Sequence, residues 1–125
     1  FKQLDIAIKR RSDIREKYIK AINKNNYLDY SSHKGCYQYS NYFFTVISES
    51  RDTLAKYMKK NGVYCTFRYY PLHRINLFKN SSTIKDMIGA DKFADTALNI
   101  PIHQNLTDKE VTKIVSLLKN YSENY

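Results

Sequence analysis

The chain has 125 residues, of which 42% are hydrophobic, and its formal net charge is +9. This length fits one domain with a core of its own, and three Gly and two Pro are too few for Gly-rich phosphate loops or low-complexity linkers. No apolar run approaches the roughly 18–20 residues of a membrane-spanning helix, and the N-terminus lacks the shape of a signal peptide.

An amphipathic helix is predicted over residues 3–23, because apolar side chains recur at three- and four-residue steps through Ile14, Tyr18 and Ile22. A loop rich in Asn and Ser follows over 23–35. Residues 37–47 are dense in aromatic and β-branched types, which is typical of a strand. Both faces of this segment turn apolar near its end, so we expect a central strand.

A helix is predicted next over 51–60, with Ser50 as its cap and Gly62 just past its end. Residues 63–68 have the pattern of a second strand, which Pro71 stops because proline cannot continue a ladder. The pattern then indicates a short turn or helix over 74–78, a loop over 80–83, a helix over 91–98 and an extended stretch over 99–103.

The strongest local signal is the capping box Thr107-Asp108-Lys109-Glu110, which opens a last helix. Four side chains of that helix are expected to pack inward: Val111, Ile114, Val115 and Leu118. Residues 121–125 are predicted to be a frayed tail. The order of elements alone leaves two arrangements open, a βαβ unit over 37–68 or antiparallel pairing within an α+β layer.

No self-sufficient catalytic or metal site emerges from the sequence. His33, His73 and His103 lie far apart and none has the spacing of a metal ligand pair, and no G-x-S-x-G nucleophile elbow occurs. Cys36 and Cys65 fit neither a zinc site nor a disulfide scaffold, so we expect two reduced thiols.

The densest polar and aromatic run is 66–74, with the sequence TFRYYPLHR. It places Arg68, Tyr70 and His73 at the end of a predicted strand. A guanidinium matches phosphate oxygens, and loops that follow strands commonly carry binding groups on a rigid support. The simpler alternative is a surface loop whose Tyr rings cover the edge of the core.

Three segments together resemble one family. Residues 62–73 (GVYCTFRYYPLH) are similar to its Gly-Ile-x-Thr … Tyr-Pro-Leu-His pattern, and residues 90–107 are similar to its Ala-x-x-x-Ala/Ser … Leu-x-Leu-Pro-x-His … Leu-Thr pattern. Leu4, Asp5 and the pair at 10–11 resemble its long connecting helix. The family is that of the DegT-type sugar-nucleotide aminotransferases, which depend on pyridoxal phosphate (PLP). The resemblance covers nearly the whole chain in the right order.

The resemblance implies that residues 1–125 are a single C-terminal small domain, with 1–23 as the end of the connecting helix and the large PLP-binding domain absent. We predict an α+β fold, with a small sheet of mostly antiparallel strands flanked by helices and a long N-terminal helix. The Schiff-base lysine belongs to the large domain, so this chain is expected to hold no catalytic residue, no metal and no PLP. The full-length enzyme would carry the cofactor.

Family members are dimers that bind a sugar nucleotide near the subunit boundary, and the Tyr-Pro-Leu-His segment borders that cleft. The resemblance therefore makes Tyr70 and His73 candidate substrate-binding residues, and Arg68 joins them on its position and charge. One departure is Asn41, where the family usually carries a His. We expect a homodimeric full-length enzyme in the cytoplasm, with a sugar nucleotide as its partner and no membrane contact.

Two other classes of function stay open. The net charge of +9 and the aromatic strand also fit a basic α/β nucleic-acid-binding module, in which exposed rings at Tyr37, Tyr39 and Phe43 stack on bases. Nucleic acid is the less favoured partner, because basic residues are spread along the chain rather than gathered in a patch. The third class is a stand-alone interaction module.

Overall fold

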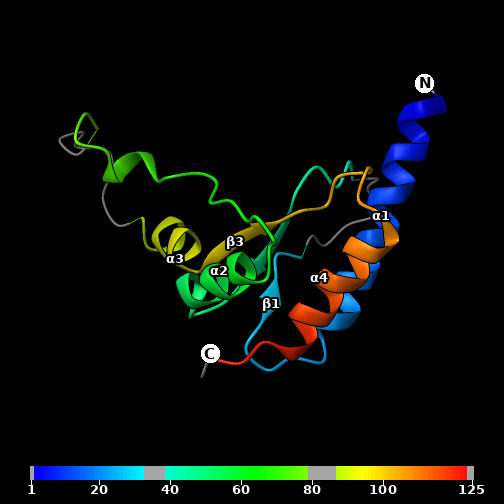
Figure 1. Cartoon of the computed structure of the whole chain (residues 1–125). Coiled ribbons are helices and arrows are strands. Elements are labelled where there is room, and N and C mark those ends of the chain that lie inside the picture. Colours follow the sequence, from blue (N-terminus) through cyan, green and yellow to red (C-terminus); the bar gives the residue numbers. More distant parts are fainter. Residues whose placement is uncertain (1, 33–38, 79–86, 124–125) are drawn as a thin grey trace.

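Four helices and a small sheet make up the part of the chain described by the computed structural model, residues 2–32, 39–78 and 87–123. In chain order the elements are α1 (Lys2–Ile22), β1 (Asp29–Tyr30), β2 (Phe44–Ile47), α2 (Arg51–Lys60), the 3-10 helix η1 (Leu72–Arg74), α3 (Ile88–Thr96), β3 (Ala97–Ile100) and α4 (Asp108–Asn120). Figure 1 shows α1 and α4 side by side on one flank of the sheet, and α2 with α3 on the other.

The sheet has the order β1-β2-β3, and both pairs of strands are antiparallel. β2 is central, as the sequence predicts, and Phe44, Thr45 and Val46 are all buried. The predicted α+β class is confirmed. The βαβ alternative is excluded, because the chain after α2 does not return as a parallel strand; there Thr66 makes an isolated antiparallel bridge with Asn99.

One hydrophobic core joins α1, the sheet, α2 and α4. Tyr18 on α1 is fully buried at its centre, and its ring meets the Phe44 ring edge-on at 5.5 Å between centroids. Its hydroxyl donates to the carbonyl of Pro101 at 2.8 Å, which satisfies the polar end of the side chain. Burial of such a side chain contributes roughly 1.5–3 kcal/mol, so α1 is held mainly by its second half.

The predicted capping box is confirmed at the start of α4. The Thr107 backbone N–H donates to the Glu110 carboxylate at 2.8 Å, and the Glu110 N–H donates to the Thr107 hydroxyl at 3.3 Å. The bond from the Thr107 N–H, followed by one from the Thr107 hydroxyl to the same carboxylate, holds the pKa of Glu110 below its usual value. Of the four side chains expected to face inward, three are buried and Val115 is partly buried.

The prediction of a frayed tail is wrong at Tyr121, which is buried and packs on the Tyr57 ring at 5.4 Å. The buried amide of Asn25 donates to the carbonyls of Leu118 and Tyr121, both at 2.9 Å. A side chain from the loop after α1 therefore caps the end of α4. Residues 124–125 lie outside the described residues.

The strand predicted over 37–47 is much shorter. Its described part includes β2, but residues 39–43 are not strand, and residues 37–38 lie outside the described chain. Asn41 has φ of 47°, a left-handed conformation that breaks an extended run and that Asn tolerates well. Tyr42 and Phe43 follow it as exposed side chains.

Two boundaries around the predicted helices also differ from expectation. The helix predicted over 91–98 begins at Ile88 and ends at Thr96, because Ala97 and Leu98 pair with β2 instead. Ser50 stands at the N-cap position of α2, but its hydroxyl donates to Glu123 at 2.9 Å and does not cap the helix. In each case a partner distant in sequence outweighs the local preference.

Candidate functional site

The polar and aromatic run predicted to bind substrate begins on a rigid support. Thr66 and Asn99 exchange both backbone hydrogen bonds, at 3.0 and 2.9 Å. The Asn99 side chain in turn accepts a bond from the Thr45 hydroxyl at 2.7 Å, within the buried layer of the sheet. The chain beyond Thr66 then runs outward past α3 to η1 (Figure 1).

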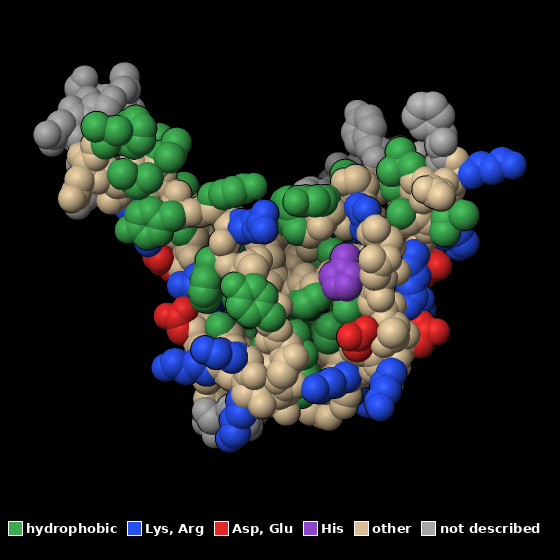
Figure 2. Space-filling model, turned by 45° about the horizontal axis from the view of Figure 1, so that its top comes forward, with side chains coloured by type: hydrophobic (Ala, Val, Ile, Leu, Met, Phe, Trp, Pro, Cys, Tyr) green, Lys and Arg blue, Asp and Glu red, His purple; other side chains and the backbone are tan. Residues whose placement is uncertain are grey.

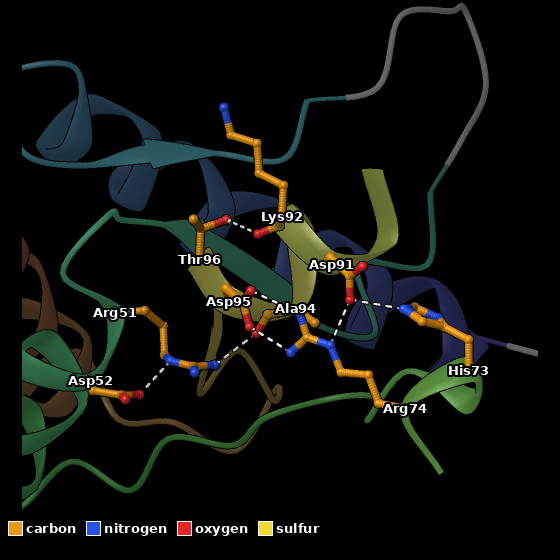
Figure 3. A network of polar contacts seen from close by, with 9 residues as sticks. All are labelled: Arg51, Asp52, His73, Arg74, Asp91, Lys92, Ala94, Asp95 and Thr96. Carbon is orange, nitrogen blue, oxygen red and sulfur yellow. Dashed lines mark hydrogen bonds and ion pairs between the residues drawn. The ribbon is translucent and has the colours of Figure 1, made fainter. Parts of the chain in front are cut away.

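A cluster of ionic contacts ties η1 to α3, as Figure 3 shows. The Arg74 guanidinium donates to both oxygens of Asp95, at 2.7 and 2.8 Å, and its Nε donates to Asp91. Hydrogen bonding by Arg74 lowers the pKa of Asp95, and Arg74 itself has a raised pKa because of these two carboxylates. Two parallel bonds of this kind fix direction as well as distance.

His73 belongs to the same cluster. Its Nε2 lies 2.8 Å from Oδ1 of Asp91, and only 18% of its side chain is exposed. The hydrogen bond from His73, followed by that from Arg74, lowers the pKa of Asp91. The ring is therefore engaged with α3 on one side.

Arg51 joins the cluster to α2. Its guanidinium lies 4.4 Å from the centroid of the Phe67 ring, and it donates to the Ala94 carbonyl at 2.9 Å. Its ion pair with Asp52 is a charge contact rather than an aligned hydrogen bond. Phe67 is thereby held over α2 by a cation–π contact.

Two hollows lie on either side of Arg68, which lines both. The first has a volume of about 320 Å³, and its wall includes Tyr70, Pro71 and the paired cations Arg51 and Arg74. The second has a volume of about 470 Å³ and lies over the end of β3. Its wall includes Tyr42, Phe43, Tyr64, Asn99 and His103.

The structure brings two of the three predicted substrate-binding residues together. Arg68 and Tyr70 are both exposed and share the first hollow. His73 lines neither of the two hollows and faces Asp91 instead. The roles of all three in substrate binding stay predictions.

We call the contacts of His73 and Arg74 with the carboxylates of α3 the clamp. Sequence reasoning missed the two carboxylates in it, Asp91 and Asp95. Their spacing of four residues within α3 puts both carboxylates on one face of the helix. With Arg74 as the last residue of the run 66–74, that spacing was a usable signal. No sequence pattern indicated that Tyr64 and His103 line the same hollow. Their segments are brought together by the Thr66–Asn99 bridge, which joins residues distant in sequence.

Large apolar side chains are exposed on the face that carries the hollows. Among them are Tyr64 at 80% exposure, Tyr69 at 81% and Tyr70 at 66%. Figure 2 shows apolar side chains gathered on this face around a hollowed centre. Exposed apolar area of this kind marks a contact or ligand-binding surface.

The described residues hold no group of three or more His, Cys, Asp or Glu that could bind a metal. In the same part of the chain, no helix is both long and apolar enough to cross a bilayer.

The family model of the DegT/DnrJ/EryC1/StrS aminotransferases matches residues 1–119. The chain belongs to this aminotransferase family. A dTDP-4-dehydro-2,3,6-trideoxy-D-glucose 4-aminotransferase from Saccharopolyspora spinosa is 28% identical to it over 88 residues, which are 69% of this chain and 22% of that protein.

Solved structures agree with the family match. The aminotransferase TlmJ from Streptoalloteichus hindustanus is 29% identical, with a TM-score of 0.85 over 94% of this chain and 32% of its own. A protein from Streptococcus pneumoniae solved in a PLP form is 24% identical, with a TM-score of 0.73 over 90% of this chain and 30% of its own, which shows the shared fold. The chain thus spans about a third or less of these relatives.

The aminotransferase family depends on PLP, which its enzymes attach to a lysine. The described residues do not fit that requirement by themselves. Every described lysine is exposed, and none lines either hollow beside Arg68. The two hollows beside Arg68 are lined by hydrogen-bond donors and aromatic rings.

Proposed function

We propose that this chain is the C-terminal small domain of a larger PLP-dependent aminotransferase that acts on a keto sugar nucleotide in sugar or polysaccharide biosynthesis. The family match supports the reaction class. The chain spans only 22% of the length of one relative and 32% of another. This partial coverage supports its role as one part of a larger enzyme. PLP supplies the chemistry of amino transfer when it is bound in that enzyme.

The observation that carries the proposal is the clamp that holds the run after Thr66 in place. Arg74 and His73 fix its far end to Asp91 on α3, while the backbone bridge at Thr66 fixes its near end. Arg68 lies between these two anchors with its side chain exposed. Groups held in advance in this way lose less conformational freedom when a ligand binds.

In this proposal Arg68 and Tyr70 bind the substrate from one wall of the cleft. The Arg68 guanidinium donates to phosphate oxygens, and the Tyr70 hydroxyl adds a neutral hydrogen bond. His73 is kept in the set, although its Nε2 is engaged with Asp91, because its other ring nitrogen can face the substrate. The exposed apolar rings around them exclude water once the rest of the enzyme covers this face.

We also propose that the complete enzyme is a homodimer in the cytoplasm. The apolar face supports the dimer, because its Tyr64 and Tyr69 side chains are 80% and 81% exposed, and a partner surface would bury them. Sedimentation of the full-length protein tests this, and a monomer at micromolar concentration contradicts it.

The experiment that tests the proposed function uses the full-length protein encoded by the same gene. Purified protein with PLP and an amino acid donor should aminate a dTDP- or UDP-linked keto sugar, as followed by mass spectrometry. Arg68→Ala should raise KM about tenfold, the value of one charged hydrogen bond, whereas the distant surface variant Lys59→Ala should not. An upstream reading frame without a PLP-binding domain would rule out the complete enzyme.

The nucleic-acid-binding alternative is not supported by the aromatic side chains. In β2, Phe44 and Val46 are buried, so the described sheet offers no open aromatic face for bases. Phe43 is exposed but precedes the strand, Tyr39 is half-buried, and Tyr37 lies outside the described residues. A stand-alone interaction module is distinguished by whether the chain is expressed without further domains.

A further inference from the structure

Arg11 on α1 joins two segments of the chain that lie far apart in sequence. Its Nε donates to the side-chain oxygen of Gln104 at 3.2 Å, and its Nη1 donates to the Ser40 carbonyl at 3.1 Å. Gln104 lies in the chain between β3 and α4, and Ser40 lies in the chain before β2. Because a guanidinium presents its donors in a planar fork, one side chain can hold two acceptors in a fixed relation.

The bond to Ser40 supports the turn at Asn41. Asn41 has φ of 47°, a left-handed conformation that costs an L-residue energy although Asn tolerates it better than most. The bond from Arg11 holds the carbonyl of the peptide that precedes Asn41, so it opposes relaxation of this turn. The turn leads into Tyr42 and Phe43, which line the second hollow.

The bond to Gln104 acts on another segment of the same wall. Gln104 follows His103, which is exposed and also lines the second hollow. Figure 1 shows the chain after β3 crossing toward α1 before α4 begins. Further along α1, the hydroxyl of the buried Tyr18 donates to the Pro101 carbonyl at 2.8 Å. Helix α1 therefore holds this segment at more than one point, and Arg11 extends that support to the edge of the hollow.

The neighbouring Arg10 has different partners. It donates to the Leu106 carbonyl and to Asp108, both at 2.8 Å. These acceptors stand at the beginning of α4, and no hydrogen bond joins Arg10 to the described part of the chain before β2. Arg10 thus fastens α1 to α4, whereas Arg11 fastens two loops to each other.

We propose that Arg11 is a positioning residue, which sets the spacing of the two loops at the second hollow without contacting the substrate. The inference rests on the proposed function, in which this face of the domain binds the substrate. It adds to that function a residue on α1, outside the segment after Thr66. Without Arg11 both loops stay attached to the sheet but are no longer held relative to each other. Substrate binding then weakens, while turnover of the bound substrate changes little.

The first test follows the two loops in the 125-residue chain by amide NMR. Arg11→Ala should shift the resonances of Asn41 and Tyr42 as well as that of His103, because both bonds are lost. Arg10→Ala should shift the resonances around Leu106 and leave those of Asn41 and Tyr42 in place. If Arg11→Ala leaves the Asn41 and Tyr42 resonances unchanged, the inference is overturned.

The second test measures the kinetics of the full-length enzyme. Arg11→Ala should raise KM for the sugar nucleotide about fivefold and change kcat by less than about twofold. Arg11→Lys keeps the charge but lacks the fork that reaches two acceptors, so its KM should also be raised. Gln104→Ala should raise KM by a smaller factor. Combining it with Arg11→Ala should add nothing further, because the link between the loops is already lost.

Arg10→Ala and Lys9→Ala are the matched controls. Arg10→Ala removes an equal charge and two bonds from the same turn of α1, so it should lower the melting temperature about as much as Arg11→Ala, by roughly 3–6 °C. Its KM should stay within about twofold of the original. Lys9→Ala removes an exposed cation and should change neither quantity. An equal rise of KM in either control overturns the inference, because lost stability or lost charge then explains the effect.

Failure of the positioning role is distinguishable from failure of the proposed function. An active full-length enzyme whose Arg11→Ala variant keeps its KM overturns the positioning role alone. A full-length protein without aminotransferase activity, beside a 125-residue chain whose Asn41 and His103 resonances both respond to Arg11→Ala, overturns the proposed function alone.

Discussion

The hydrogen bond beneath the second hollow gives the sharpest test of how the site is supported. Thr45 on β2 donates to Oδ1 of Asn99 on β3 at 2.7 Å, and the two residues are 5% and 7% exposed. Thr45→Val keeps the shape of the side chain but removes the donor. The Asn99 oxygen then stays buried without this partner, and the backbone of Asn99 is what holds Thr66.

The expected loss follows from the burial of both groups. A lost hydrogen bond that leaves a buried acceptor unsatisfied costs about 1–3 kcal/mol. For a chain of this length, a loss of about 2 kcal/mol lowers the melting temperature by roughly 6–10 °C. Asn99 also anchors the segment after α2. The substitution should therefore increase the hydrogen-exchange rate of the Thr66 amide more than it increases the exchange rates of the amides in α4.

Thermal unfolding followed by circular dichroism measures this change. Thr112→Val is the matched control, because the Thr112 hydroxyl bonds to the Asp108 carbonyl on the exposed face of α4, and its loss should cost about 0.5 kcal/mol or less. The double variant Thr45→Val with Asn99→Leu should recover part of the stability, since no polar group is then left unpaired. If Thr45→Val melts within 1–2 °C of the original chain, about the effect of an ordinary surface change, the reasoning is refuted.

Three further predictions follow from the ionisable groups and the helix cap. The pKa of Asp91 lies below its usual 3.8 because of its hydrogen bonds with His73 and Arg74. The contribution of Asp91 to stability is therefore complete above about pH 4 and is lost as the pH falls through the folded-state pKa. An NMR titration of its carboxyl carbon checks the direction of the shift, and a midpoint above 3.8 would contradict it. Burial raises the pKa of the Cys65 thiol from 9.0 to about 12, so alkylation at pH 8, followed by mass spectrometry at that residue, should be about a thousandfold slower than for a free thiol; labelling at the free-thiol rate would show the thiol to be accessible. Thr107→Ala removes the capping box and should cost about 1 kcal/mol in denaturant unfolding, whereas an unchanged midpoint would mean that the cap contributes nothing.

The sequence determined the elements whose stability is local. The helix over α1 follows from the recurrence of Ile14, Tyr18 and Ile22, and the start of α4 follows from the Thr107 capping box. Both signals lie within a few residues of one another, so no distant partner is needed to interpret them. The three ordered motifs together, one of them around Tyr70, likewise indicated the family, which the match over residues 1–119 shows.

Only the tertiary structure decided the short strands and the arrangement of the site. Ala97 is not part of the predicted helix, because its backbone pairs with β2. The left-handed conformation of Asn41 ends the extended segment that the neighbouring residues favour. His73 contacts Asp91, whereas Arg68 lines both hollows and has no hydrogen bond or ion pair with any residue that the structure describes. Strand pairing across the sheet and ion pairing across a loop depend on residues that are distant in sequence. Composition and periodicity describe only local patterns, so they cannot predict these contacts.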